Sequence, residues 1–465
     1  MAIGTFKLPI GSTTATASTT TYTRPADWLA MPTPGVQEVI GLMAVYDDDG
    51  NYVALQCQGA YTVDWGDGTI TNYGNNVIAS YQHTFASLPS GTLTSKGFRQ
   101  ALVRITPQAG QNLTFVGFNI QHPTLAKSYA PGWLEFDIRT PNTLPTFGGG
   151  GNVIRYARLE KITVRQMGAN NPQNWCTNLF NLKSVYIEPS ETTGRTLFNN
   201  MFQACYSLVE VNLFDTSTGT GFQSMFNGCF SLETLPAFNF GSATDLTQAF
   251  TSMSSLKSVP VLTLAGNLTQ LFLNNYNLKE VAVLNTNAVT NFTGMFQNCG
   301  ALKNVPLINT SAGTNFTSMF SGCNALTEIP LLNTASASNM TGMFNGCNNL
   351  VYLPALNTSN VTTVNQMFNN CINLRELPAF SLPVCTVFTS WLANNATLSK
   401  SNIINATRGH SYSGMSLSRA NIVTIFNNLG TAAGTQTINV STNPGRAGLI
   451  PSEIAIATGK GWTVV

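Results

Sequence analysis

Charged residues are scarce in this chain. Asp, Glu, Lys and Arg make up 9% of the 465 residues, against about 25% in an ordinary globular protein. The formal net charge is only +2, so the sequence supplies no basic surface for phosphate groups. We therefore expect no nucleic-acid partner.

Histidines and long apolar runs are scarce as well. The three histidines, His83, His122 and His410, are far apart, which disfavours a histidine metal centre or proton relay. We expect no enzyme activity, no metal and no cofactor. No apolar run approaches the ~20 residues that span a bilayer, and no basic segment followed by an apolar one opens the chain. These absences predict no membrane insertion and no Sec-type export signal.

The chain does contain an internal repeat of about 24 residues. Phenylalanines recur from Phe202 to Phe368 at spacings of 24, 24, 22, 24, 24, 24 and 24, and Leu392 continues the series. The consensus unit is T-N-[FM]-T-x-M-F-x-x-C-x-x-L-x-x-[LIV]-P-x-L-N-T-S. One such unit cannot bury its own apolar side, so stacked units must share a core. In three units that core is expected to consist of Phe226, Cys229, Leu232, Phe320, Cys323, Leu326, Phe344, Cys347 and Leu350.

Each unit is expected to hold two elements. Phe316, Met319, Phe320 and Cys323 have the i, i+3, i+4, i+7 spacing of a short helix, and residues 326–329 have the pattern of a short strand. The predicted fold is an α+β repeat solenoid of the leucine-rich-repeat kind, right-handed, with strands on one face and helices on the other. About twelve strands between 134 and 398, ~4.8 Å apart, predict a rod of roughly 50 to 60 Å.

Five regions follow from these patterns. We expect an extended Ser/Thr-rich arm at 1–35, a small all-β sandwich at 36–108, degenerate leading repeats at 109–199, the solenoid at 200–400 and a C-terminal cap at 401–465. In the sandwich, strands at 38–46 and 52–55 flank Asp47–Asn51, whose composition predicts a hairpin turn. Leading strands are expected at 133–138, 159–164 and 182–187. The cap is expected to contain a helix at 422–429 and strands at 437–440 and 461–464.

Two motifs resemble known families. The Met-Phe-x-x-Cys-x-x-Leu-x-x-Leu-Pro unit resembles the BspA-like class of bacterial leucine-rich repeats, closely over 200–398 and loosely over 130–199. Val63-Asp-Trp-Gly-Asp-Gly68 with His83-Thr-Phe85 is similar to the signature of PKD-type β-sandwich domains, although Val63, Trp65 and Phe85 differ from that family's residues. The whole layout resembles repeat-bearing fibre or appendage proteins of tailed bacteriophages, which implies a virion protein assembled in the host cytoplasm.

Several residues have two readings. Six of the nine cysteines occupy one column of the repeat and are interpreted as small buried apolar residues, because the spacing between coils exceeds what a disulfide can bridge; a disulfide or metal frame is the alternative. They are Cys205, Cys229, Cys299, Cys323, Cys347 and Cys371. The spacing of the other three, Cys57, Cys176 and Cys385, suggests no site. Asp64 and Asp67 are interpreted as turn residues, with calcium binding as the alternative. The four Asn-Thr pairs from Asn285-Thr286 to Asn357-Thr358 favour an internal hydrogen-bonded ladder over a polar binding strip.

The few charges of the solenoid are ordered. Eleven lie between 200 and 398, and nine of these occupy the first or second place after the column leucine. A solvated strand face is the simple explanation, and a recognition surface is the alternative. The candidate recognition residues, called the charged face below, are Lys257, Lys279, Glu280, Lys303, Glu328, Tyr352, Arg375 and Glu376.

Together these features predict a structural virion protein of a tailed phage, a fibre, spike or decoration, that attaches to a host surface. Its partners would be other virion proteins, a host-surface glycan or protein, and further copies of itself. A bacterial surface adhesin is one alternative. A tail-associated polysaccharide-degrading enzyme is another, from a different class. The location on head or tail, the receptor, the oligomeric state and the attached end stay open.

Overall fold

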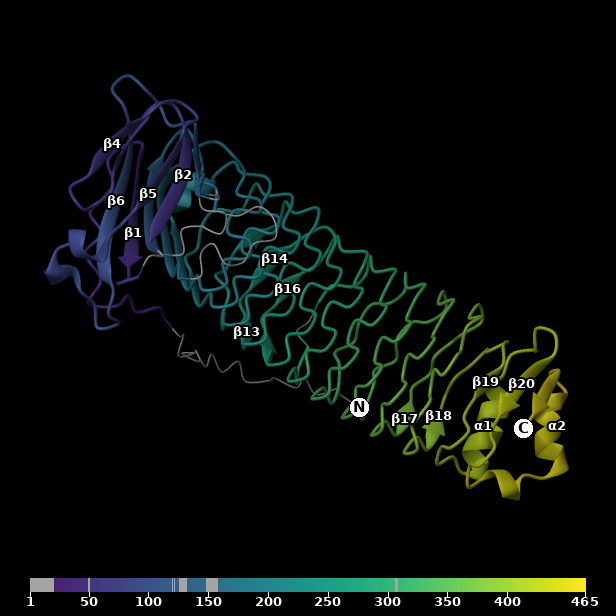
Figure 1. Ribbon diagram of the computed structural model, residues 1–465. Coiled ribbons are helices and arrows are strands. Elements are labelled where there is room, and N and C mark those ends of the chain that lie inside the picture. The colour runs from purple at the N-terminus through teal and green to yellow at the C-terminus, as the bar shows by residue number, and fades with distance from the viewer. Residues whose placement is uncertain are drawn as a thin grey trace, which may run out of the picture.

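The protein is an elongated stack of coils (Figure 1). The computed structural model describes residues 21–48, 51–118, 120, 122–124, 132–147, 158–305 and 308–465. Strands of the N-terminal part gather at one end, the coils run from them through teal and green, and helices α1 and α2 lie with the C-terminus at the other end. The expected repeat solenoid is confirmed.

The N-terminal part is built from two β-sheets. Their strands are β1 (Glu38–Val45), β2 (Tyr52–Gln58), β3 (Tyr61–Asp64), β4 (Ile70–Tyr73), β5 (Ile78–Gln82), β6 (Arg99–Pro107) and β7 (Phe115–Gly117), with 3-10 turns η1 (Phe85–Ser87) and η2 (Ser90–Thr92). One sheet has the order β11-β10-β9-β8-β1-β6-β3-β4 and the other β5-β2-β7. Val39 and Val103 of the first sheet and Leu55 and Cys57 of the second belong to one apolar core.

The predicted hairpin between the first two strands is wrong. β1 pairs with β6 and β8, whereas β2 pairs with β5 and β7 in the other sheet. Asn51 ties the ends of the connection together, since its side chain accepts from the Tyr46 N–H and donates to the Tyr46 carbonyl. A connection between sheets uses the same turn-forming residues as a hairpin, so composition could not separate the two.

The large sheet continues directly into the solenoid. β8 (Trp133–Thr140) is antiparallel to β1 but parallel to β9 (Lys161–Met167), which is followed by the parallel strands β10 (Ser184–Ile187) and β11 (Glu210–Val211). The three predicted leading strands are therefore confirmed. Turn η3 (Pro189–Thr192) lies between β10 and β11.

Further along the stack the strands become short. They are β12 (Asn239–Phe240), β13 (Ser258–Val259), β14 (Leu262–Leu264), β15 (Glu280–Val281), β16 (Leu284–Asn285), β17 (Glu376–Leu377) and β18 (Lys400–Ser401). The expected strand at 326–329 is wrong, and none forms at 350–353 either. The column proline limits the ladder here, because Pro330 and Pro354 lack the N–H that a longer strand needs.

The helix predicted in each unit is also wrong, so the coils are not α+β. Residues 316–323 form consecutive turns, in which the N–H of Met319 donates to the carbonyl of Phe316 at 3.2 Å. The N–H groups between them donate to the next coil instead. Those of Phe316 and Phe320 donate to the backbone carbonyls of Asn339 and Met343, both at 2.9 Å. We call this element the turn column; it recurs from coil to coil over residues 174–394. Its inward stripe is as predicted, because Phe316, Met319, Phe320 and Cys323 are all fully buried.

The turn column depends on left-handed backbone positions. Each coil has two, four residues apart, as at Ser318 (φ 54°) and Gly322 (φ 74°). Asn, Gly, Ser, Gln and Ala occupy these places over 174–394, and no β-branched residue does. Gly and Asn, which tolerate left-handed φ best, hold most of these places, so their share of the repeat consensus has a backbone cause.

Aromatic rings stack along the inside of the coils. The rings of Phe296, Phe320, Phe344 and Phe368 lie 5.6 to 5.8 Å apart and nearly parallel. Each is fully buried, so the Phe column is the continuous core that unites units unable to fold alone.

The described part of the expected arm, 21–35, lies on the large sheet. Arg24 pairs with Glu135 of β8 at 2.5 Å, and Trp28 packs on Leu42, Phe98 and Leu134. The rest of the arm, 1–20, is outside the described residues.

The C-terminal part contains more helix than expected. It comprises β19 (His410–Ser411), α1 (Arg419–Asn428), β20 (Gln436–Asn439), η4 (Arg446–Gly448), α2 (Pro451–Thr458) and β21 (Trp462–Val464). β19, β20 and β21 are parallel neighbours, which extends the solenoid's strand direction. Helix α2 is an addition to the prediction, with Pro451 in its first turn.

Matched leucines in one unit test the packing. Leu326 is fully buried and Leu331 is 65% exposed. We expect Leu326→Ala to lower the free energy of unfolding by about 2 to 5 kcal/mol and Leu331→Ala to change it by less than about 0.5 kcal/mol. Urea unfolding followed by circular dichroism measures both; equal effects would contradict this packing.

His410 predicts an acid sensitivity. Burial lowers its pKa to about 4, so the unfolded chain takes up the proton first as pH falls below about 6.5. The contribution of neutral His410 to the free energy of unfolding is complete above that pH and is lost as the pH falls toward 4. Between pH 7 and 4.5 the wild type should lose on the order of 2 kcal/mol more stability than His410→Phe, as urea unfolding at the two pH values would show. Equal losses would contradict a neutral buried imidazole.

Candidate functional site

The charged face lies on the outer side of successive coils. Seven of its eight residues are exposed and Glu376 is half-buried. Tyr352 is the most prominent ring, at 63% exposure. Each stands one or two places after a buried column leucine such as Leu278 or Leu302, so the eight residues form two neighbouring columns. Whether this face binds a partner stays a prediction.

Ion pairs neutralise only the two ends of the charged face. Lys257 pairs with Glu233 at 2.8 Å, and Glu376 pairs with Lys400 at 2.5 Å. Between them, Lys279, Lys303 and Arg375 form no ion pair with any described residue. Their cations are exposed and free for an external ligand.

An apolar column runs beside the charges, and sequence reasoning missed it. Its residues, called the apolar ridge, are Leu213, Ala237, Val261, Val283, Leu331, Ala355 and Ala379, all exposed. The largest are 52 to 65% exposed. Single exposed apolar residues are ordinary, and it is their repetition in one column that makes the apolar ridge a candidate interaction surface. The sequence does carry a signal for this ridge, because the position directly after the column proline is apolar in unit after unit.

The nine core residues expected in three units lie inside the stack. All of them, from Phe226 to Leu350, are at most 2% exposed. The cysteine thiols of the column donate hydrogen bonds to backbone carbonyls of the preceding coil. Cys323 Sγ donates to the Phe296 carbonyl at 3.1 Å, and Cys347 Sγ donates to the Phe320 carbonyl at 3.0 Å. Where the column holds Asn275 or Asn395, the amide nitrogen donates to the same carbonyl position.

No cysteine forms a disulfide; all nine are free and buried. Among the described residues, no group of three or more His, Cys, Asp or Glu side chains is placed to hold a metal ion. The same part of the chain holds no helix with the length and apolar character to cross a membrane.

The Asn-Thr pairs form the internal ladder that the sequence favours. Thr310 Oγ1 donates to the Asn333 carbonyl of the next coil at 2.8 Å, and Thr334 Oγ1 to the Asn357 carbonyl at 2.8 Å. These threonines are at most 1% exposed. Each Asn closes a local turn, as where Asn309 Oδ1 accepts from the Ser311 N–H at 3.0 Å.

The Trp-Gly-Asp-Gly and His-Thr-Phe motifs meet in the N-terminal part. His83 Nε2 contacts the Trp65 carbonyl at 2.7 Å. Asp64 accepts from the Gly66 N–H at 3.0 Å and Asp67 from the Thr69 N–H at 3.0 Å. Both carboxylates thus act as turn residues, in agreement with the favoured interpretation. Gly66 has φ 79°, and a Cβ there would lie 2.6 Å from the Leu102 carbonyl oxygen, so glycine is required.

Comparisons with known proteins give a partial family match. A family model described as "Mycoplasma protein of unknown function" (DUF285) matches residues 176–261 and 266–379. No curated protein matches.

Two solved structures are similar to the chain. A leucine-rich repeat protein from Bacteroides ovatus shares 13% identity, with 77% of this chain and 97% of that chain covered and a TM-score of 0.31. The plant peptide hormone receptor RGFR1 in complex with RGF2 shares 12% identity, with 71% and 67% covered and a TM-score of 0.18. The assignment of a solenoid therefore rests on the chain's own hydrogen bonds between successive coils.

The cysteines should be unreactive in the folded protein. Burial raises the pKa of Cys57 and Cys371 to about 12 and that of Cys385 to about 11, and thiolates are the reactive form. We expect no thiol to react with a disulfide reagent at pH 8 in native protein, and all nine to react in urea. Absorbance of the released chromophore measures both; a fast-reacting native thiol would contradict the buried column.

Proposed function

We propose that this protein is a non-enzymatic structural component of a tailed bacteriophage particle, a fibre, spike or decoration that attaches to a host surface. The carrying observation is the charged face beside the apolar ridge, on a stack with few other charges, in which Lys279, Lys303 and Arg375 are exposed and have no ion-pair partner among the described residues. Such a surface offers one contact per coil, and contacts on a rigid stack act together on a repetitive target.

The proposed binding surface combines two kinds of group. Lys279, Lys303 and Arg375 supply free cations, and Tyr352 supplies an exposed ring. Val283 of the apolar ridge follows Lys279 in the same coil, and Leu331 follows Glu328 in the same way. A host-surface glycan or protein with acidic and apolar groups would match this combination.

The phage origin rests on the resemblance of the layout, the PKD-type motif included. A bacterial surface adhesin would use the same face and differ in where it resides. The polysaccharide-degrading enzyme needs paired carboxylates about 5 to 9.5 Å apart in a cleft. On the charged face, the acidic residues alternate with basic ones, which favours binding over hydrolysis.

The charged face can be tested by replacing four of its residues. The variant Lys279→Ala, Lys303→Ala, Tyr352→Ala and Arg375→Ala should lose binding to host cells, while its melting temperature stays that of the wild type. A matched control replaces Thr290, Thr314, Ser338 and Thr362, exposed on another side of the same coils, by Ala. Flow cytometry of labelled protein on cells measures binding, and retained binding by the first variant would contradict the proposal.

The particle assignment has its own test. Immunogold electron microscopy with an antibody to residues 200–400 should label phage particles. Label confined to the envelopes of uninfected cells would instead identify a cellular adhesin.

A further inference from the structure

The turn column has a direction. In each coil the outgoing N–H groups point toward the C-terminal end, and the accepting carbonyls belong to the following coil. In one coil, for example, Val364, Gln366, Phe368 and Asn370 donate to the carbonyls of Val387, Thr389, Trp391 and Ala393 at 2.8 to 3.0 Å. On other sides of the coils the direction is reversed, since the Thr314 and Ala325 N–H groups donate to Thr290 and Gly300 of the preceding coil.

This row of bonds stops at one coil. Phe388, Ser390, Leu392 and Asn394 hold the same places as those four donors, with φ 49° at Ser390 and 63° at Asn394. Their N–H groups have no acceptor in the described part of the chain. The row resumes one coil later, where the Tyr412 N–H donates to the Asn439 carbonyl at 2.7 Å.

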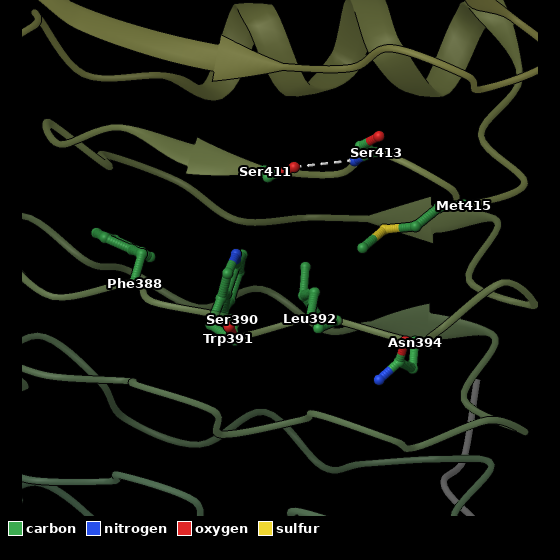
Figure 2. Close-up of a pocket in the computed structure, with 9 residues that line it drawn as sticks. Phe388, Ser390, Trp391, Leu392, Asn394, Ser411, Ser413 and Met415 are labelled. Carbon is green, nitrogen blue, oxygen red and sulfur yellow. Dashed lines mark hydrogen bonds between the residues drawn. The ribbon is translucent and has the colours of Figure 1, made fainter.

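A pocket of about 420 Å³ lies where these bonds are missing, between residues 388–394 and 411–415. Figure 2 shows the residues that line it. Phe388, Trp391 and Leu392 belong to one coil, and Ser411, Ser413 and Met415 belong to the next. Trp391 occupies the place that methionine holds in the four preceding coils.

Trp391 carries a buried donor in the wall of the pocket. The residue is 2% exposed, and its Nε1 has no hydrogen-bond partner in the described structure. A buried N–H without a partner is costly, at about 1 to 3 kcal/mol. The residues that line the pocket thus hold a row of backbone donors, a buried indole N–H and the hydroxyls of Ser390, Ser411 and Ser413, and no carboxylate lines it.

We propose that this pocket binds a small carboxylate-bearing ligand, with a uronic acid as the fitting chemical class. The carboxylate would accept from the open row of N–H groups and from Trp391 Nε1. The carbon skeleton would lie against Phe388, Leu392 and Met415. Successive backbone N–H groups with left-handed residues between them are a recurrent anion-binding arrangement. This site is separate from the charged face and independent of the proposed attachment role.

Amide NMR of the full chain tests the site directly. With ¹⁵N-labelled Phe and Leu, sodium glucuronate should shift the amide protons of Phe388 and Leu392 downfield in a saturable manner. Phe368 is the internal control, because its N–H already donates to the Trp391 carbonyl at 2.8 Å. Glucose at equal ionic strength should have no such effect. No saturable shift in the millimolar range, or an equal shift with glucose, would overturn the proposal.

Two variants locate the ligand. Trp391→Phe removes the indole donor and should weaken glucuronate binding about tenfold or more. Ser413→Phe places a ring in the pocket and should abolish binding, whereas Ser338→Phe, on an exposed serine of another coil, should not. Ser413→Phe keeps the test valid if Trp391→Phe fails to fold. Wild-type affinity in a folded Ser413→Phe variant would overturn the site.

Discussion

The hydrogen bonding of the turn column to the following coil is the constraint on which the rest of the structure depends. A turn column cannot satisfy its own alternate N–H groups, so each coil needs the next one in register. Buried backbone groups without partners are costly, which fixes the spacing of the coils. The Phe column, the Cys column and the Asn-Thr ladder are the side-chain consequences of that register. Each repeats wherever the backbone repeats.

The same constraint explains the unusual composition. Two left-handed positions in every coil favour Asn and Gly, and the local turns and the ladder between coils use Asn and Thr side chains. The interior needs residues of fixed size, which Phe, Met, Cys and Leu provide. Few positions remain for charge, and these lie on the strand side, where they do not disturb the stack. The low content of charged residues is therefore explained by the fold and requires no functional cause.

Much of the core could be predicted from the sequence, but the backbone conformation could not. The stripe of Phe316, Met319, Phe320 and Cys323 was identified correctly as inward-facing. Its helical spacing also fits a row of turns, since both place every third or fourth residue on one side. The choice between them depends on hydrogen bonds to the next coil, which one unit cannot reveal. The hairpin at Asp47–Asn51 failed for a similar reason, because strand partners far away in the sequence decided the pairing. The apolar ridge was visible as the place after the proline, yet only exposure distinguished it from core.

Residue-resolved hydrogen exchange of the full chain is the most direct test of the central claim. The account predicts that the N–H groups of Val364, Gln366, Phe368 and Asn370, which donate to the following coil, are strongly protected. It also predicts fast exchange at Ser390 and Asn394, where the row of bonds stops. Equal protection at 364–370 and 388–394 would contradict it.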